Sequence, residues 1–420
     1  MLRAAVAATA VLLRELARGG TARGDRVARA AGRALVRLCT ELGATFIKVG
    51  QIASTRADLL PRALVAELLA LQDRVPPFPF DDARRTIEEG LGRPLESLFA
   101  EFAREPIAAA SVAQVHRAVL RATGEPVAVK VRRPDIADKV ALDRSILLFV
   151  GRALERVVPT LRLVSLEGAL RAFCDAVAQQ IDLSNEARHN ARFSANFADD
   201  PDVRFPRLVP EACCDTVLTM EFVDGVHEDR LAEEGIDVRA LVATGMRCVC
   251  RMIFLHGFVH ADLHPGNLRF LPRATLVLLD LGLVGELTDD DRVMSARTLY
   301  ALATGDGVTV ARLFYDNSPH VAVRDYAAFE RDIVEFVDAV RRQGLARLQV
   351  TAEIGRIFDI LRRHGVQARS HMTMANLAMM TAEGLGKRLA PDMSLTDEAV
   401  PYLAEALSSA PAVAAGGAPS

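Results

Sequence analysis

The sequence predicts an α+β protein in which a small β-rich part lies between two helical parts. Apolar residues alternate over residues 112–120 and again over 127–131, and Thr123-Gly124-Glu125 has turn composition, so this stretch is expected to form a β-hairpin. Residues 1 to about 75 contain few prolines and no strand-like alternation, which favours helices. Towards the C-terminus apolar residues recur at helical spacing, as at Tyr326, Phe329, Ile333, Phe336 and Val340.

The composition is that of a globular protein. The chain has 420 residues, half of them apolar and a quarter charged, and its net charge is −3, which fits two to three domains with a large core. This charge balance does not favour a general nucleic-acid binder. The six cysteines form no C-x-x-C pair, and several lie in apolar runs, so we expect reduced core thiols of a cytosolic protein.

Membrane contact is expected to be peripheral. No apolar run reaches the roughly 18–20 residues that a transmembrane helix needs. The first 40 residues carry eight arginines against Glu15 and Asp25. This segment can lie on an anionic membrane surface, act as a cleavable targeting segment, or be an ordinary solvated helix. We therefore expect a cytoplasmic protein, with any membrane contact at the inner face of the cell membrane.

The polar residues of the stretch 256–282 predict a phosphoryl-transfer site. Asp262 and Asn267 lie in a loop interrupted by Pro265 and Gly266, and Asp280 follows an apolar strand at residues 275–279. In sites of the protein-kinase type a loop Asp meets the acceptor hydroxyl, a loop Asn binds one Mg²⁺, and an Asp-x-Gly after a strand binds another. Each residue alone would be a turn former, but the order and spacing fit together.

A zinc site is the competing interpretation of this stretch. His256, His260 and His264 are four residues apart, which on one helix would align them as ligands. Gly257 and Pro265 argue against a continuous helix, and no Glu or Cys completes the set. We therefore favour phosphoryl transfer.

Lys130 is the predicted phosphate-contacting lysine because it ends the strand sequence Val-Ala-Val-Lys. Glu186 is its expected partner, since a buried lysine stays charged and oriented only if a carboxylate meets it. The gap between them implies an insertion, and Ser165 is expected to cap a helix over residues 166–181 within it. Where a kinase has a glycine-rich loop, this chain has Ala108-Ala109-Ala110-Ser111. The methyl groups should stiffen this loop and crowd the phosphates, so we expect nucleotide binding to differ from that of an ordinary protein kinase.

Two further strands are expected at residues 203–209 and 216–223, and the second ends in residues 220–225, where a kinase has the hinge between its lobes. A helix over 238–255 capped by Asp237 should follow. Only five residues separate Gly282 from Thr288, which begins a helix at Asp289. A peptide-directed kinase has a long activation segment there. We therefore do not expect a protein substrate.

Five segments together resemble the ABC1/ADCK/UbiB family of atypical, protein-kinase-like ATPases: KVGQ at 48–51, AAAS at 108–111, VAVK at 127–130, HGFVHADLHPGN at 256–267 and DLG at 280–282. The resemblance covers residues 40 to about 300. It implies a bilobal kinase-like fold, with an N-terminal helical extension at 1–90, an N-lobe with a helical insertion at 91–223, a helical C-lobe at 224–408 and a disordered tail at 409–420.

The resemblance also implies residue roles. Asp262, Lys130 and Glu186 would be catalytic, and Asn267 and Asp280 would bind Mg²⁺. Lys48, Gln51 and Asp182 would be regulatory, with Lys48 and Gln51 folded back across the cleft. The family usually has Glu-x-Asp where this chain has Gln180-Ile181-Asp182, which puts the pairing with Lys48 in doubt. Nucleotide contacts would come from Ile107, Ala108, Ala109, Ala110, Ser111, Val112, Ala113, Gln114, Val115, Lys130, Glu221 and Val223.

The function that the resemblance implies is an Mg²⁺-dependent ATPase or kinase that uses ATP, or binds ADP, and supports ubiquinone or other isoprenoid-quinone metabolism at a membrane. Expected partners are the nucleotide, isoprenoid-quinone or lipid precursors, an anionic membrane surface and quinone-biosynthesis proteins, with no nucleic acid. Two alternatives stay open. One is a nucleotide-binding regulatory protein with little turnover, and the other is a small-molecule phosphotransferase, against which the Lys-x-Gly-Gln segment counts.

Overall fold

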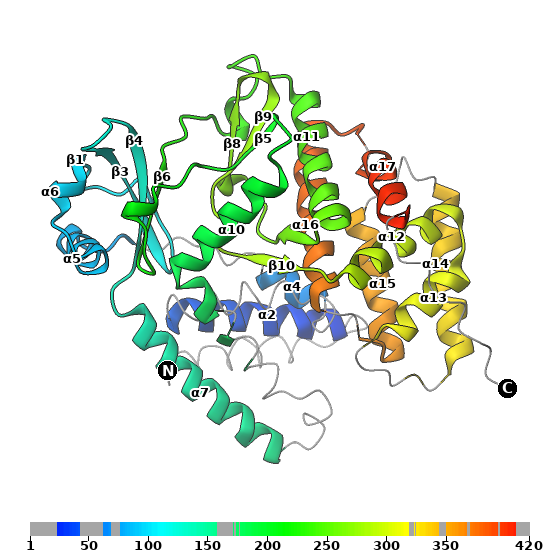
Figure 1. Ribbon diagram of the computed structural model, residues 1–420. Helices are drawn as coiled ribbons and strands as arrows, with labels where there is room; N and C mark the ends of the chain where they lie inside the picture. Colours follow the sequence, from blue (N-terminus) through cyan, green and yellow to red (C-terminus); the bar gives the residue numbers. More distant parts are fainter. Residues whose placement is uncertain are drawn as a thin grey trace. The chain divides into compact units, whose positions relative to one another are not determined.

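The chain folds into two compact units, which are described separately (Figure 1). The first contains the described residues up to Ala191 together with Pro206–Val223, and the second contains Arg192–Phe205 and the described residues from Asp224 onward. The domain boundaries expected from the sequence stay predictions. The computed structural model describes residues 23–42, 62–68, 76–157, 171, 174–175, 177–318, 323, 325–343, 350–367, 370–393 and 395–408.

A five-stranded antiparallel sheet organises the first unit. The predicted hairpin is confirmed as β3 (Ala113–Leu120) and β4 (Pro126–Arg132), with Val115 opposite Lys130. The sheet runs β1 (Phe99–Phe102), β3, β4, β6 (Val217–Glu221), and the short β2 (Ala108–Ala109) also pairs with β3. These strands form because β-branched residues alternate between two packed faces.

Helices cover both faces of this sheet (Figure 1). Alternate β4 valines, among them Val129, are fully buried against α5 (Phe80–Leu91) and α6 (Leu95–Leu98). On the other face, Ala128 packs near the start of α10 (Leu183–Asn196). The unit also contains α7 (Ile136–Val157), α2 (Arg23–Leu42) and α4 (Arg62–Leu68), which confirms helices in the described parts of the N-terminal region. Lys48, Gln51, half of the helix expected over 166–181 and the tail at 409–420 lie outside the described residues.

The second unit is mainly helical. Asp237 caps α11 (Val238–Cys250) as predicted, and the helix continues as a π-helical turn, η3 (Arg251–His256). Thr288 and Asp291 form a capping box at the start of α12 (Asp289–Thr304), which confirms the predicted helix start. The remaining long helices are α13 (Gly307–Asp316), α14 (Tyr326–Gln343), α15 (Val350–His364), α16 (Ser370–Leu389) and α17 (Leu395–Ser408).

Short strands position the loops of this unit. The strand expected over 203–209 was predicted too long: β5 covers only Val203–Arg204, because Pro206 has no N–H to continue a ladder. β5 pairs in parallel with β9 (Thr275–Leu278), which also pairs with β8 (Leu268–Leu271). β7 (Phe258–His260) pairs with β10 (Val284–Glu286). Single 3₁₀ turns occur at Pro210–Ala212, Glu228–Arg230, Pro265–Asn267 and Pro272–Ala274.

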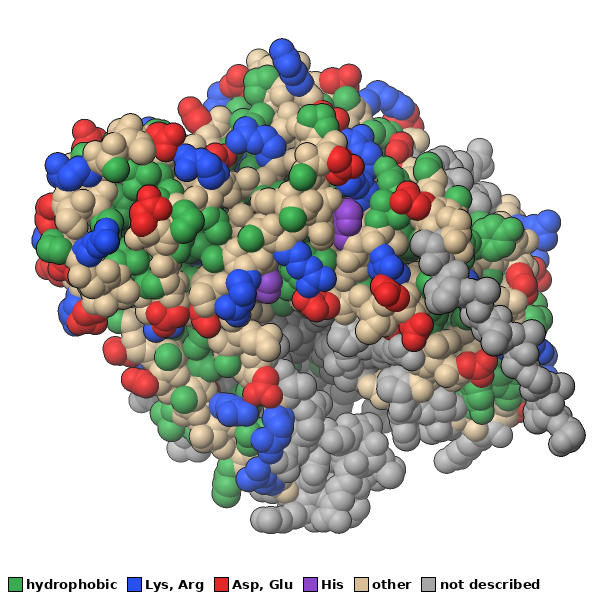
Figure 2. Space-filling view, viewed as in Figure 1, with side chains coloured by type: hydrophobic (Ala, Val, Ile, Leu, Met, Phe, Trp, Pro, Cys, Tyr) green, Lys and Arg blue, Asp and Glu red, His purple; other side chains and the backbone are tan. Residues whose placement is uncertain are grey.

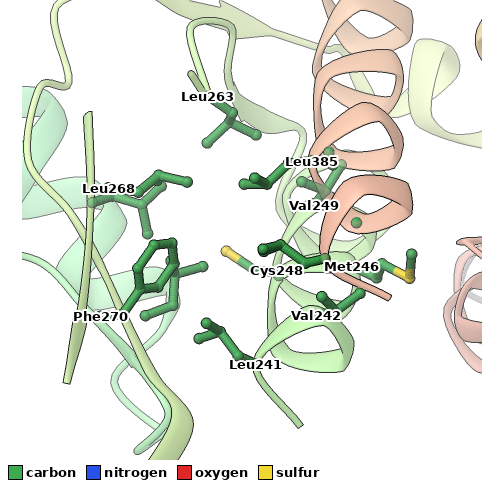
Figure 3. Close-up of a pocket in the computed structure, with 15 residues that line it drawn as sticks. Leu241, Val242, Met246, Cys248, Val249, Leu263, Leu268, Phe270 and Leu385 are labelled. Atoms are coloured by element: carbon green, nitrogen blue, oxygen red, sulfur yellow. The ribbon is translucent and has the colours of Figure 1, made fainter. Parts of the chain in front are cut away.

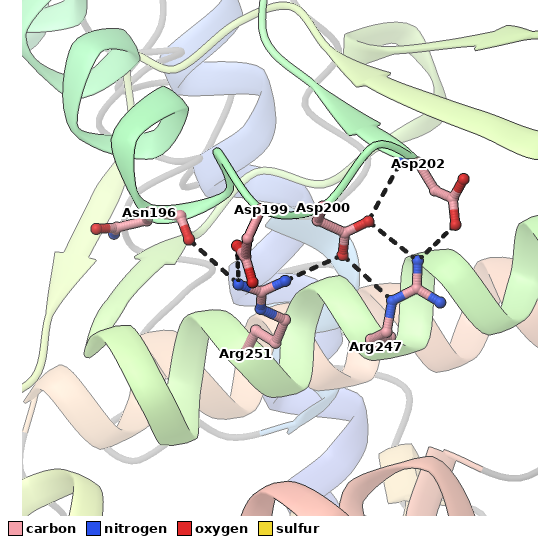
Figure 4. Close-up of polar contacts among 6 residues, drawn as sticks. All are labelled: Asn196, Asp199, Asp200, Asp202, Arg247 and Arg251. Carbon is pink, nitrogen blue, oxygen red and sulfur yellow. Dashed lines mark hydrogen bonds and ion pairs between the residues drawn. The ribbon is translucent and has the colours of Figure 1, made fainter.

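A buried charge cluster joins the loop before β5 to α11 and η3 (Figure 4). The Asp200 carboxylate, with 6% of its side chain exposed, accepts from Arg247 at 3.2 Å and from Arg251 at 3.2 Å. Arg247 also reaches Asp202 at 3.1 Å, and Arg251 reaches Asp199 at 2.6 Å. The loop is therefore fixed by paired charges as well as by apolar packing.

The six cysteines form no disulfide. Cys39, Cys174, Cys248 and Cys250 are buried, as expected for core residues, whereas Cys213 and Cys214 are half-buried. Within the described ranges, the helices lack the combination of length and apolarity needed to cross a membrane. On the face drawn in Figure 2, Lys and Arg side chains are interspersed with Asp and Glu side chains over the described residues.

Candidate nucleotide and metal site

The predicted pair of Lys130 and Glu186 lies in the first unit. Because side chains alternate along β4, Lys130 points to the sheet face opposite the buried valines, where α10 packs. Its Nζ donates to both Glu186 carboxylate oxygens, at 3.0 and 2.8 Å. Only 10% of the lysine side chain and 5% of the glutamate side chain are exposed. Two opposite charges are thus held in a fixed, mostly dry position.

Asp182 helps to place Glu186. It lies directly before α10, and its carboxylate accepts from the Ser184 N–H at 2.9 Å, which is the hydrogen bond of an N-terminal cap. α10 begins at Leu183, the residue after Asp182, so Glu186 lies in its first turn. Nearby, Gln180 is 8% exposed and its amide nitrogen has no hydrogen-bond partner.

The alanine-rich loop precedes β3 in the same unit. Ala108 and Ala109 pair with Val115 and Gln114 across β2 and β3, and the Ala110 N–H closes the turn on the Ala113 carbonyl at 2.8 Å. The side chain of Gln114 is fully buried, so it offers no side-chain atom to a ligand, although the sequence predicted a nucleotide contact at this position. Glu221 ends β6, and Val223 is the last residue of the first unit.

His260 organises the group of predicted site residues that lies in the second unit. This fully buried side chain ends β7. Its Nδ1 accepts from the Asp262 backbone N–H at 3.0 Å, which leaves Nε2 to donate to the Asp280 carbonyl oxygen at 2.6 Å. Burial lowers the pKa of His260, which keeps the ring neutral and this donor and acceptor pattern intact. The histidine thereby links the Asp262 loop to the Asp280 turn.

Asn267 and Asp280 complete this arrangement. The Asn267 amide nitrogen donates to the Asp262 backbone oxygen at 3.0 Å and lies 3.4 Å from the Asp262 carboxylate, which leaves its amide oxygen for a ligand. Asp280 accepts from the Gly282 N–H at 3.0 Å through one carboxylate oxygen. Amide and carboxylate oxygens are the groups that Mg²⁺ prefers. The donor set therefore fits that metal.

The same loop is anchored by apolar residues that alternate with the polar ones. Leu263 and Leu268, 6% and 3% exposed, enter a small cavity next to Phe270 and the α11 side chains Leu241 and Cys248 (Figure 3). Leu385 of α16 completes the far wall. Asp262 and Asn267 are not among the residues that line this cavity.

The three histidines do not form a metal site. His256 ends η3, His260 ends β7, and His264 caps the next 3₁₀ turn through the Gly266 N–H. Among the described residues, no group of three His, Cys, Asp or Glu side chains could hold a metal ion. The competing zinc interpretation therefore has no support there.

The structure thus brings the predicted site residues together in two groups. Lys130 and Glu186 meet in the first unit, beside the alanine-rich loop, and Asp262, Asn267 and Asp280 meet in the second. The role of His260 was not predicted from the sequence, in which this residue stood out only as a potential metal ligand. No local signal distinguishes a histidine that bonds a turn 20 residues away, because that contact depends on the pairing of β7 with β10.

Comparison with known proteins identifies the family. Residues 70–314 match the ABC1 atypical kinase-like domain, and residues 333–394 match the UbiB helical domain. The chain belongs to the ABC1/UbiB family of atypical kinase-like proteins. The α+β fold class and the family resemblance predicted from the sequence are confirmed.

Relatives in this ABC1/UbiB family cover most of the chain. The "Probable protein kinase UbiB" of Pseudomonas fluorescens (strain Pf0-1) is 34% identical over 371 residues, which is 86% of this chain and 69% of the relative. The protein of the same description from Pseudomonas aeruginosa (strain LESB58) is 35% identical over 370 residues, with the same coverage. The structure of Rv3197 from Mycobacterium tuberculosis, solved with erythromycin, has a TM-score of 0.53 and 19% identity, covers 82% of this chain and 91% of its own, and shows similarity of fold alone.

Proposed function

We propose that this protein is an Mg²⁺-dependent ATPase or small-molecule kinase that acts in ubiquinone or other isoprenoid-lipid metabolism at a membrane surface. The observation that carries the proposal is the His260 link, which makes the Asp262 loop and the Asp280 turn parts of one hydrogen-bonded unit. Membership of a kinase-like family and the names of its relatives support the same reaction class.

In this proposal each group has a defined task. Lys130, fixed by Glu186, contacts nucleotide phosphates, and the alanine-rich loop covers them. Bound Mg²⁺, held by the Asn267 amide oxygen and the Asp280 carboxylate, supplies charge neutralisation for the transferred phosphoryl group. Asp262 accepts the proton of the attacking hydroxyl or water. The short connection from Gly282 to α12 offers no long segment on which a peptide could dock.

The direct test is Mg-ATP hydrolysis with and without vesicles of anionic lipid. Asp262→Asn removes the proton acceptor and keeps the shape, so we expect turnover to fall by about 10² to 10⁴. Asp290→Asn, an exposed carboxylate in the first turn of α12, is the matched control and should leave turnover unchanged. Turnover that survives Asp262→Asn would exclude this role for the carboxylate.

Nucleotide binding separates the enzyme from a regulatory protein. A ligand at a hundred times its dissociation constant stabilises the fold by about 2.7 kcal/mol, and Asp280→Asn should abolish the Mg²⁺-dependent part of that stabilisation. A parent chain that is stabilised by nucleotide and yet shows no turnover under any lipid condition would favour the regulatory alternative instead.

A further inference from the structure

The segment before α5 makes an unusual set of side-chain bonds to strands far along the chain. Its Phe78 is 8% exposed and packs in the core of the first unit, while Pro76 and Pro77 are exposed. The backbone of this segment has no strand partner. Instead, the side chain of Gln114 bonds to the Phe78 backbone and the side chain of Arg133 bonds to the Pro76 carbonyl, across sequence separations of 36 and 57 residues. We call residues 76–78 the strap.

Gln114 holds one end of the strap. Its Oε1 accepts from the Phe78 N–H at 3.0 Å, and its Nε2 donates to the Phe78 carbonyl at 3.4 Å and to His116 Nε2 at 2.8 Å. His116 Nδ1 then donates to the Ala103 carbonyl at 2.8 Å. Both side chains are 0% exposed and every polar atom named here has a partner. A buried network that is fully satisfied fixes its members in one arrangement.

Arg133 holds the other end, and it also holds the alanine-rich loop. Its Nη2 donates to the Pro76 carbonyl at 2.6 Å and to the Ala110 carbonyl at 3.2 Å, and its Nε donates to the same Ala110 oxygen at 3.3 Å. The guanidinium carbon lies 5.2 Å from the centre of the Phe78 ring. One guanidinium therefore joins the strap and the loop through charge-assisted hydrogen bonds.

The geometry points to a clamp: we propose that Arg133 and Gln114 are positioning residues that fix the alanine-rich loop to the strap and so limit the freedom of this loop, which in the proposed function covers the nucleotide phosphates. Because the peptide bond is trans and planar, holding the Ala110 oxygen also sets the direction of the Ser111 N–H. Gln114 acts on the same loop through its backbone pairing with Ala109. Only the expected effect on nucleotide binding rests on the proposed function; the contact between strap and loop does not.

The loop itself can be tested without nucleotide, by hydrogen exchange of peptides covering residues 107–115 and 76–80 in the full chain. Arg133→Met keeps the apolar stem and removes the donors, and Gln114→Met removes the bonds to Phe78. Both should speed exchange of the strap and of the loop together. Arg121→Met is the matched control, because Arg121 also donates to two backbone carbonyls, those of Glu96 and Phe99, away from the loop.

Nucleotide affinity supplies the second readout. Loss of a pre-organised loop should raise the dissociation constant for Mg-ATP about tenfold in Arg133→Met, with Arg133→Lys partly restored and Arg121→Met equal to the parent. A change in affinity that merely follows thermal stability, or equals that of the control, would overturn the positioning role. Unchanged loop exchange in Arg133→Met overturns the clamp and leaves the proposed function standing. A parent that binds no nucleotide overturns the proposed function and the nucleotide part of the clamp, while exchange still decides whether strap and loop are joined.

Discussion

At the scale of single residues, the environment decides what a side chain does. His260 and His264 lie four positions apart, yet one is fully buried and links two loops while the other is exposed and caps a turn. Lys130 differs from an ordinary strand lysine only because Glu186 meets it in a mostly dry position. Burial therefore fixes the hydrogen-bond partners of His260 and the ion pair of Lys130 with Glu186.

The Lys130 and Glu186 pair predicts an asymmetric response to mutation. Glu186→Gln leaves a buried lysine charge without its counter-charge and should lower the free energy of unfolding by about 3 kcal/mol. Glu125→Gln, which breaks a pair with Arg207 at 2.8 Å whose side chains are about half exposed, should cost less than about 1 kcal/mol. Denaturant unfolding of the two variants measures the difference. Equal losses would mean that the buried pair is no stronger than a surface pair.

His256 predicts a loss of stability in acid. Burial first, and then the positive charge of Arg251, lowers its pKa to about 4, and its Nε2 is buried without a hydrogen-bond partner. The unfolded chain binds this proton near pH 6.5, so stability falls as pH drops from 6.5 towards 4 and is unaffected by this group above 6.5. Because the ring is half-buried, the discounted contribution is about 1–2 kcal/mol.

The measurement for His256 is denaturant unfolding across this pH range. His256→Gln cannot take up the proton and should lose less stability than the parent between pH 6.5 and 4, although the buried His116 and His260, whose pKa values are also lowered, keep part of the slope. Identical slopes in parent and variant would show that His256 does not titrate in this window.

Among the helices and strands, those specified by residues close in the sequence were predicted correctly, whereas features that depend on packing between distant segments were not. The β3–β4 hairpin and the caps at Asp237 and Thr288 were predicted because alternation and capping act over a few residues. The strand predicted over 203–209 is longer than β5 because Pro206 has no N–H to donate to the ladder. The π-helical turn η3, which directly follows α11, could not be predicted because no residue type or spacing in its sequence distinguishes it from an α-helix.

The cluster that joins α11 and η3 to the loop before β5 gives a prediction at this scale. Asp200→Asn leaves Arg251, with 11% of its side chain exposed, short of a counter-charge and should cost about 3 kcal/mol or more. Asp199→Asn changes a neighbour with 74% of its side chain exposed and should cost less than about 1 kcal/mol. The two free energies of unfolding are compared by denaturant titration. A similar cost for both would argue against a structural role of the buried carboxylate.

At the scale of the whole molecule, the two groups of site residues belong to different units. If one nucleotide uses both, Mg-nucleotide should slow hydrogen exchange in peptides covering residues 107–115 and in peptides covering 260–282. Glu186→Gln and Asp280→Asn should each weaken the protection in both sets. Protection limited to one unit would mean that the two groups do not serve one ligand.

Sequence patterns were enough to predict the candidate catalytic and metal-binding residues and much of the local structure. The spacing of Asp262, Asn267 and Asp280, the hairpin that carries Lys130 and the missing activation segment could all be predicted, because each depends on residues close in the chain. The structure confirmed the predicted pair of Lys130 and Glu186, 56 residues apart. Tertiary packing alone made His260 a link between two loops and joined residues 76–78 to the alanine-rich loop through Gln114 and Arg133. Those contacts depend on which strands and helices pack together, and no local pattern records that choice.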